Sequence, residues 1–194
     1  PALIQPKLDG HRCIAIVKNG VCTLWTRTRK LITSVPHVNK AIEKLSGGED
    51  REYDGELYCH AWVEKYGKEE AFEMVGKIVR TKEPVEGHEE IQYNVYDAPV
   101  SGTFEERYSI VCHDFIDAAN RRELDLDTLI LVETAIVDNE SEAENYYEDC
   151  LERGYEGAML RNKDGIYFGH VTKRSNDLLK MKKFEDAEFK IVDV

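Results

Sequence analysis

Lys7 begins a short segment whose residue types could support covalent catalysis. The segment reads Lys7-Leu8-Asp9-Gly10-His11-Arg12, so a lysine at a strand end is followed by an acid, a turn-forming glycine and an arginine. A lysine amine acts as a nucleophile only when it is unprotonated, and neighbouring positive charge lowers the pKa of such an amine. Alone, the pattern fits a surface hairpin with a charged tip equally well, so its meaning depends on the rest of the chain.

Four further short motifs follow in order, and each has an ordinary structural explanation when taken alone. Side chains alternate along a strand, so Lys180 and Lys182 would share one face and Lys183 would lie on the other. Glu56 and Glu156 supply hard oxygen ligands of the type that Mg²⁺ or Mn²⁺ accepts. Together with the Lys7 segment, these make five motifs in a fixed order, which argues against coincidence. The four further motifs are Asp54-Gly55-Glu56-Leu57, Tyr93-Asn94-Val95-Tyr96-Asp97, Glu156-Gly157-Ala158-Met159-Leu160-Arg161 and Leu179-Lys180-Met181-Lys182-Lys183.

Together, the five motifs resemble those of the covalent nucleotidyltransferases, which comprise ATP-dependent DNA ligases, RNA ligases and mRNA-capping enzymes. The Glu-Gly-Ala-Met-Leu-Arg and Leu-Leu-Lys-Met-Lys forms favour the adenylation domain of an ATP-dependent DNA ligase, and the likeness covers essentially the whole chain. The resemblance implies that the full enzyme takes AMP from ATP onto Lys7, passes it to the 5′-phosphate of nicked double-stranded DNA and joins the strand. The alternatives are an RNA ligase or a capping guanylyltransferase and, in another class, a catalytically silent binding module.

The resemblance also implies roles for single residues. Tyr96 would stack on the adenine ring, unless Tyr93 is the exposed ring of that strand. Gln5 lies where the family reads the adenine amino group, and its carboxamide oxygen can accept a hydrogen bond from that group, which favours ATP over GTP. The other nucleotide contacts would come from Lys7, Arg12, Arg27, Glu56, Arg174, Lys180 and Lys182.

Metal and DNA contacts are expected at further positions. The resemblance implies that Glu56 and Glu156 hold the Mg²⁺ or Mn²⁺ ion, while Asp54 could be only structural. Positive charge gathers in Arg27-Thr28-Arg29-Lys30 and again between Lys173 and Lys183, where five basic residues accompany one acid. The predicted DNA-facing patch consists of Arg27, Arg29, Lys30, Lys173 and Lys183.

The elements that must position these residues follow from hydrophobic patterning. Asn19-Gly20 predicts a two-residue hairpin, and capping boxes at Thr103 and Ser141 predict the starts of two helices. We expect an α+β domain of two packed, mainly antiparallel sheets flanked by helices. The resemblance to DNA ligase adenylation domains implies that this architecture is ATP-grasp-like. The predicted strands are Arg12–Val17, Val21–Thr26, Tyr53–Cys59, Ile91–Tyr96, Leu129–Val137, Gly157–Arg161, Leu178–Phe184 and Phe189–Val194, and the other predicted helices are Val38–Leu45 and Glu69–Arg80.

Composition limits the classes of function. The 194 residues include 26 Lys and Arg against 38 Asp and Glu, a formal net charge of −12, so the overall field does not favour nucleic acid and a local basic patch must do so. Nothing resembles a run of about 18 apolar residues or a secretory leader, which argues against a membrane protein and a secreted protein respectively. Five cysteines without a Cys-x-x-Cys spacing predict reduced thiols.

The organisation expected from the resemblance is one nucleotidyltransferase domain over residues 1–194. Family members need a C-terminal oligonucleotide-binding (OB-fold) domain, which we expect to be missing from this chain, together with any N-terminal extension. We expect a monomer that works in the cytoplasm of a bacterial or virus-infected cell, or in the nucleus if the source is eukaryotic.

Overall fold

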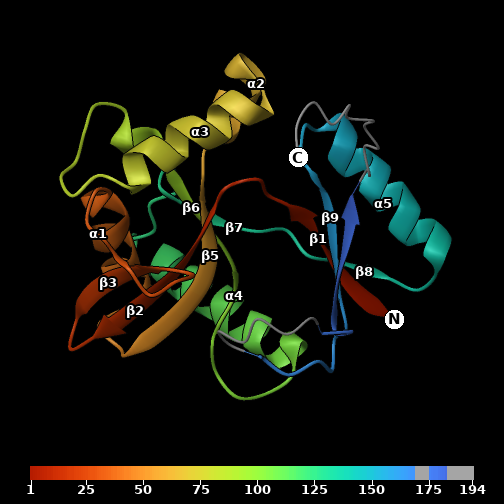
Figure 1. Cartoon of the computed structure of the whole chain (residues 1–194). Helices are drawn as coiled ribbons and strands as arrows, with labels where there is room; N and C mark the ends of the chain where they lie inside the picture. Colours follow the sequence, from red (N-terminus) through yellow and green to blue (C-terminus); the bar gives the residue numbers. More distant parts are fainter. Residues whose placement is uncertain (169–174, 183–194) are drawn as a thin grey trace, which may run out of the picture.

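Two β-sheets organise the part of the chain that the computed structural model describes, residues 1–168 and 175–182 (Figure 1). The larger sheet has the strand order β4-β3-β2-β5-β6-β7, and only the β6–β7 pair is parallel. Its strands are β2 (His11–Lys18), β3 (Val21–Thr26), β4 (Leu31–Ile32), β5 (Arg51–Tyr58), β6 (Gln92–Asp97) and β7 (Leu129–Leu131).

The smaller sheet has the order β10-β9-β1-β8, and all its pairs are antiparallel. It brings together strands from both ends of the chain: β1 (Ala2–Lys7), β8 (Ala135–Val137), β9 (Gly157–Arg161) and β10 (Leu178–Lys182). The α+β class with two mainly antiparallel sheets is therefore confirmed.

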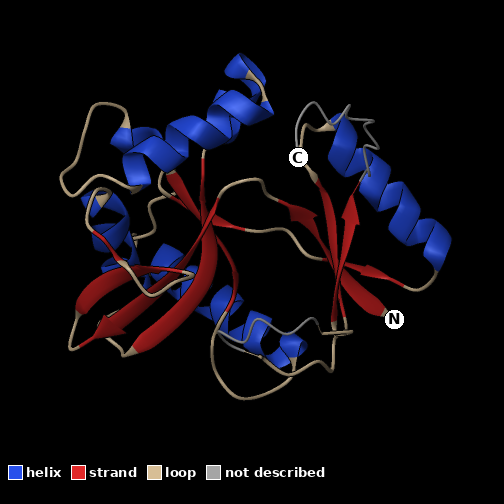
Figure 2. Cartoon of the chain, in the orientation of Figure 1, coloured by secondary structure: helices blue, strands red, loops and turns tan. Residues whose placement is uncertain are grey.

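Helices cover the outer face of each sheet. In the larger sheet, the alternate residues Cys13, Ala15 and Val17 of β2 belong to the core that lies under α1 and α3. In the smaller sheet, Ile4 and Ala158 pack against α5. Figure 2 shows α5 on the side of the smaller sheet that faces away from the larger one. The helices are α1 (Pro36–Leu45), α2 (His60–Tyr66), α3 (Lys68–Val79), α4 (Phe104–Asn120) and α5 (Glu140–Glu152), with one 3₁₀ turn at His88–Glu90.

Because side chains alternate across a strand, the residues next to these core positions point toward the other sheet. The predicted site residues of β1, β2, β5 and β10 lie at such positions, and Glu156 directly precedes β9. The fold thus places the chemistry-bearing faces of the two sheets opposite one another.

Local signals explain several boundaries. Asn19 and Gly20 adopt φ of 51° and 76°, which is the positive-φ pair that a tight hairpin requires, and the predicted hairpin is confirmed. The Thr103 side chain accepts from the N–H of Glu106 while the Glu106 carboxylate accepts from that of Thr103, so the first capping box is also confirmed. The second is wrong: α5 begins earlier than Ser141 predicts, and its cap is Asn139, which accepts from the N–H of Glu142.

One predicted strand is wrong in a way that matters for the site. Leu129–Val137 is not continuous, because the chain leaves the larger sheet after β7 and enters the smaller one as β8. The last contact with the larger sheet is the bond from the Val132 N–H to the Val95 carbonyl at 2.9 Å. The connecting residue Thr134 therefore lies between the two sheets.

The C-terminal strands and the cysteines were also predicted from the sequence. Phe189–Val194 and the last two residues of Leu178–Phe184 lie outside the described residues. All five cysteines are free and four of them are buried, as the odd count and spacing predicted. Among the described residues, no helix is both long and apolar enough to cross a bilayer.

Candidate functional site

The facing sheets enclose a cleft of about 900 Å³. Strands β1, β9 and β10 form one wall, and β2, β5 and β6 form the other. Eight residues that the sequence predicted as nucleotide contacts lie on these walls: Gln5, Lys7, Arg12, Arg27, Glu56, Tyr96, Lys180 and Lys182.

Lys7 lies at the end of β1, in a row of residues that crosses the smaller sheet. Strand register places Lys7 opposite Gly157 and Gly157 opposite Lys182, so both lysines occupy the same face. Gly157 has no room for a side chain, because an added Cβ would collide with the carbonyl oxygen of Met181 on β10. The glycine after Glu156 is therefore explained by the close approach of β9 and β10 behind the nucleophile.

Glu156 is the charged partner of Lys7. The Lys7 ammonium contacts Oε2 of Glu156, and Nζ of Lys182 lies 3.8 Å from Oε1 of the same carboxylate. Burial, and next the negative charge of Glu156, raise the pKa of the nearby Asp9 carboxyl. Lys180 and Lys182 share the face that carries Lys7, as alternation predicted, but Lys182 is linked to Lys7 through Glu156 rather than directly.

Arg12 and Asp54 form a bidentate ion pair on the opposite wall. Their nitrogen–oxygen distances are 2.9 and 2.6 Å, and the Tyr167 hydroxyl donates to the same carboxylate at 2.8 Å. Asp54 thus holds Arg12 and Tyr167 in place, which is the structural role that the sequence analysis allowed for it. Arg12 is engaged by Asp54 and Tyr167 rather than free for a ligand.

Glu56 on β5 pairs with Arg12 on the neighbouring strand β2, and its side chain faces the cleft. Within the described part of the chain, Glu56 forms no ion pair. Burial, followed by the charge of Asp54, raises the pKa of the Glu56 carboxyl to about 8, although Lys7 and Arg12 act in the opposite direction. The Tyr96 hydroxyl donates to this carboxyl at 3.4 Å. A buried carboxyl with a raised pKa is a favourable ligand for a cation, because the positive charge of the cation would stabilise the ionised form.

Tyr96 and Tyr93 have different surroundings, which decides which ring faces the cleft. Tyr93 is fully buried, with its hydroxyl 2.9 Å from the carbonyl oxygen of Cys13, and its ring fills the space that a Cβ on Gly55 would need. Tyr96 is the extra residue of a β-bulge, because the pairing shifts from Asp54–Asp97 to Gly55–Val95. Tyr96 lies two residues after Asn94, the partner of Glu56, so alternation places its side chain on the cleft face, and the bulge brings the following Asp97 to that face as well.

Gln5 lies at the inner end of the cleft in a network of buried polar groups. Its Oε1 accepts from Arg161 at 2.7 Å, and Arg161 donates to Asp97 at 3.1 Å. Arg107 donates to both oxygens of Asp97, at 2.8 and 3.1 Å. The sequence analysis assigned no role to Arg161, Asp97 or Arg107, although a charged residue on the buried side of a capped helix is a signal that could have identified Arg107.

The remaining predicted residues lie at the rim of the cleft or away from it. Arg27 is exposed at the rim, and Arg29 and Lys30 are exposed in the turn that joins β3 to β4. Lys173, Arg174 and Lys183 lie outside the described residues. Within the described ranges there is no group of three or more side chains of the metal-binding types, so Glu56 and Glu156 are the candidate metal ligands by their chemistry alone.

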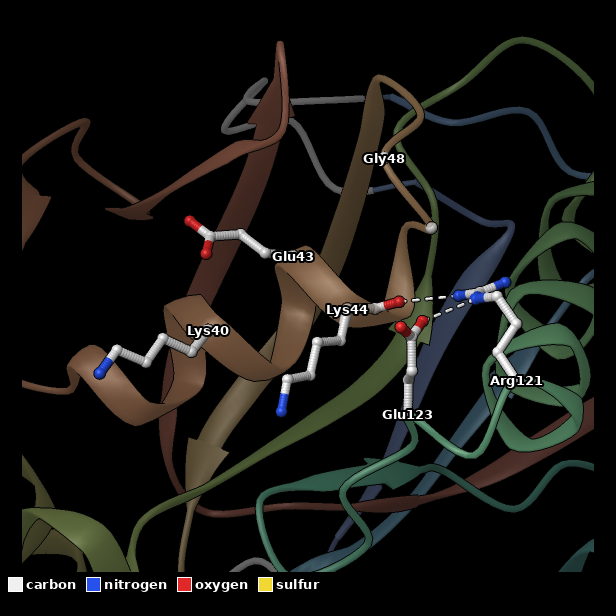
Figure 3. Close-up of a pocket in the computed structure, with 7 residues that line it drawn as sticks. Lys40, Glu43, Lys44, Gly48, Arg121 and Glu123 are labelled. Atoms are coloured by element: carbon white, nitrogen blue, oxygen red, sulfur yellow. Dashed lines mark hydrogen bonds and ion pairs between the residues drawn. The ribbon is translucent and has the colours of Figure 1, made fainter.

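A second hollow lies where α1 meets α4, and its arginine is held by structural partners (Figure 3). Arg121 donates to the Lys44 carbonyl at 2.7 Å and to the Leu45 carbonyl at 3.3 Å, and it pairs with Glu123 at 2.8 Å. A guanidinium that satisfies the last carbonyls of a helix stabilises that helix end. In this hollow Arg121 links the end of α4 to the end of α1, and the hollow is not the candidate site.

Comparison with known proteins identifies the family. The family described as "ATP dependent DNA ligase domain" matches residues 1–182. The chain belongs to the ATP-dependent DNA ligase family. RNA ligases and capping enzymes, the alternatives in the same superfamily, are thereby set aside.

Named members of the family resemble the whole chain. The DNA ligase of African swine fever virus (isolate Warthog/Namibia/Wart80/1980) is 29% identical over 98% of this chain and 44% of the viral protein. The DNA ligase of Enterobacteria phage T4 is 26% identical over 100% of this chain and 47% of the phage protein. The crystal structure of Chlorella virus DNA ligase-adenylate superimposes with a TM-score of 0.72 at 26% identity, over 96% of this chain and 63% of that one. The chain thus spans less than half the length of the African swine fever virus and phage T4 ligases.

Proposed function

We propose that this domain transfers AMP from ATP to Nζ of Lys7, the first step of DNA ligation. The observation that carries the proposal is the placement of Lys7 inside the cleft, in contact with Glu156 and on the same face as Lys180 and Lys182. An exposed lysine remote from these groups would not have supported it.

The chemistry follows from these contacts. The lone pair of Lys7 Nζ attacks the α-phosphorus of ATP, a nitrogen–phosphorus bond forms, and the bond to the bridging oxygen breaks so that pyrophosphate leaves. Lys7 must first leave its ion pair and lose a proton, and Oε2 of Glu156 is the acceptor already in contact with Nζ. Lys180 and Lys182 would offset the negative charge that moves onto the phosphoryl oxygens.

Other groups would bind the nucleotide. Tyr96 would stack on adenine, an aromatic contact of about 1 kcal/mol, while Arg27, and Arg174 outside the described residues, would approach the phosphates or ribose. Glu56 and Glu156 would hold a Mg²⁺ or Mn²⁺ ion, which needs only one or two carboxylates when phosphates and water complete its shell. When bound, such an ion supplies positive charge to the phosphates.

The later steps require more than this domain. We propose that the adenylate passes to the 5′-phosphate of nicked double-stranded DNA, and that Arg27, Arg29, Lys30, Lys173 and Lys183 contact its backbone. A C-terminal OB-fold domain acting with this one fits relatives about twice as long as the chain. Relatives from a virus and a bacteriophage support an enzyme of the cytoplasm of bacterial or virus-infected cells. We further propose that it acts as a monomer.

Mass spectrometry of the intact protein tests the proposal. After incubation with ATP and Mg²⁺, the full-length polypeptide should gain the mass of one AMP, and peptide mapping should place it on Lys7. Lys7→Ala should gain nothing, whereas the matched control Lys18→Ala, an exposed lysine at the end of β2, should react like the wild type. A wild-type protein that never carries AMP would favour the alternative of a catalytically silent binding module.

A further inference from the structure

The carboxamide of Gln5 is held in one orientation by partners at both ends. Its Nε2 donates to Oγ1 of Thr134 at 2.9 Å and to the carbonyl oxygen of Tyr96 at 3.3 Å. Its Oε1 accepts from Nε of Arg161 at 2.7 Å. Gln5 itself is 1% exposed, so these partners replace water.

These partners are themselves fixed. The Thr134 hydroxyl faces the Val132 carbonyl at 3.4 Å, so its lone pairs remain for the Gln5 amide. Arg161 is anchored on Asp97, whose two oxygens also accept from Arg107 and from the N–H of Ala98. Rotating the Gln5 amide by 180° would place its N–H groups against Arg161 and its oxygen against the Tyr96 carbonyl, and both contacts would be repulsive.

The Gln5 amide can therefore only accept a further hydrogen bond. An amide nitrogen has two N–H groups, and both are used, whereas the amide oxygen has two lone pairs and only one is used by the described residues. Gln5 lies on the cleft next to Tyr96, so it presents only an acceptor to a base that stacks there. Adenine carries an amino donor at position 6, while guanine and hypoxanthine carry a carbonyl acceptor there.

We propose that Thr134 and Arg161 are specificity-determining positioning residues, which lock Gln5 as an acceptor and so make the domain select 6-amino purine nucleotides. The proposal rests on the function proposed above and goes further, because it assigns base selection to two residues that would not touch the base. A 6-oxo purine would leave two acceptors facing one another in a buried site. Such a mismatch lowers affinity by about 5- to 150-fold.

Labelling Lys7 with competing nucleotides tests this assignment. The full-length protein is incubated with ATP, GTP or inosine triphosphate, and the rate of lysyl-nucleotide formation is measured by intact mass. Inosine triphosphate has the 6-oxo group without the 2-amino group of guanine, so it isolates the contact at position 6. The wild type should prefer ATP over inosine triphosphate by about 100-fold.

The variants separate positioning from folding. Thr134→Val removes the acceptor while keeping the shape of the side chain, and Arg161→Lys removes the fixed Nε donor, so each should lower the preference about tenfold or more. Thr134→Ser should restore it. Thr33→Val is the matched control, because its hydroxyl bonds the Lys82 carbonyl on the exposed surface, away from the cleft. Thermal unfolding identifies any variant that has lost the fold.

Each result has a defined meaning. A preference that is absent in the wild type, or unchanged in both folded variants, overturns the role of the lock while leaving adenylation of Lys7 intact. A wild type that is labelled by none of the three nucleotides removes the proposed function itself, and with it the inference.

Discussion

Lys7 and Glu156 are joined twice. The main-chain N–H of Glu156 donates to the carbonyl of Lys7 at 3.1 Å, and the Lys7 ammonium contacts the Glu156 carboxylate. The backbone bond directly follows the last pair of β1 with β9, Lys7 and Gly157, so the end of the sheet sets the position of the carboxylate. The proposed nucleophile and its proposed proton acceptor are therefore held together by the fold, and removing the charge of Glu156 tests this pair without removing Lys7.

Glu156→Gln should slow the formation of lysyl-AMP by about 100-fold, a typical loss when a positioned proton acceptor is removed. The amide keeps the size of the side chain and can still contact Lys7, so the fold should be retained. The rate is measured by intact mass against Glu152→Gln, an exposed glutamate at the end of α5. Equal rates in wild type and Glu156→Gln would mean that the Glu156 carboxylate is needed neither as the proton acceptor nor as a metal ligand.

Lys182→Met should lower the same rate by about 10- to 100-fold, because the variant removes one cation facing the transferring phosphate. Methionine keeps most of the stem of the side chain, so strand β10 should still pair with β9. Lys18→Met serves as the control, since Lys18 is exposed at the far end of β2. If the two variants react alike, Lys182 does not act on the phosphoryl group.

Much of this site could be predicted from local patterns. Alternation along β10 correctly placed Lys180 and Lys182 on one face, and Asn19-Gly20 and Thr103 correctly marked a hairpin and a helix start. These features depend on neighbours in sequence, where spacing determines geometry.

Long-range geometry could not be predicted in the same way. The Gln5–Arg161–Asp97 network joins β1, β9 and β6, and the contact of Thr134 with Gln5 depends on a chain crossing where the sequence indicated one strand. The choice between Tyr93 and Tyr96 depended on which face of β6 lies against the core, and the sequence did not mark the bulge that also brings Asp97 to the cleft. The sequence of a single segment does not show which residues of a distant strand it pairs with.

Glu56 should make the stability of the domain depend on pH. Its pKa is about 8 in the fold against an ordinary value of 4.5, so between these values the native state holds a proton that the unfolded chain has released. The stabilising contribution is complete below the ordinary pKa and disappears as the pH rises through about 8. Glu56→Gln cannot release a proton and should not show this dependence.

Urea unfolding at about pH 6 and pH 9 measures the effect. The free energy of unfolding of the wild type should fall by roughly 2 kcal/mol more than that of Glu56→Gln between these values, a figure reduced because water enters the cleft. Differences between wild type and variant are used because other groups, including Asp9, titrate in both proteins. Parallel pH profiles would show that Glu56 is already ionised in the fold.

Arg121→Ala should destabilise the domain by about 1 kcal/mol without changing Lys7 labelling. The substitution leaves the carbonyls of Lys44 and Leu45 without the guanidinium that caps the end of α1. Lys40→Ala, on an exposed position of the same helix, should have little effect on urea unfolding. A loss of labelling in folded Arg121→Ala would instead connect the hollow of Figure 3 to catalysis.

The turn that carries Arg29 and Lys30 should account for part of the affinity for nicked duplex DNA. Each basic side chain that neutralises a phosphate releases condensed counterions, so removing one such side chain changes the slope of log affinity against log salt by about 0.9. Arg29→Ser/Lys30→Ser should therefore make the slope shallower by about 2, measured by fluorescence anisotropy from roughly 50 to 200 mM salt. Lys40→Ser/Lys44→Ser lowers the net charge equally on α1. If both double variants change the slope by the same amount, overall charge rather than this turn determines binding.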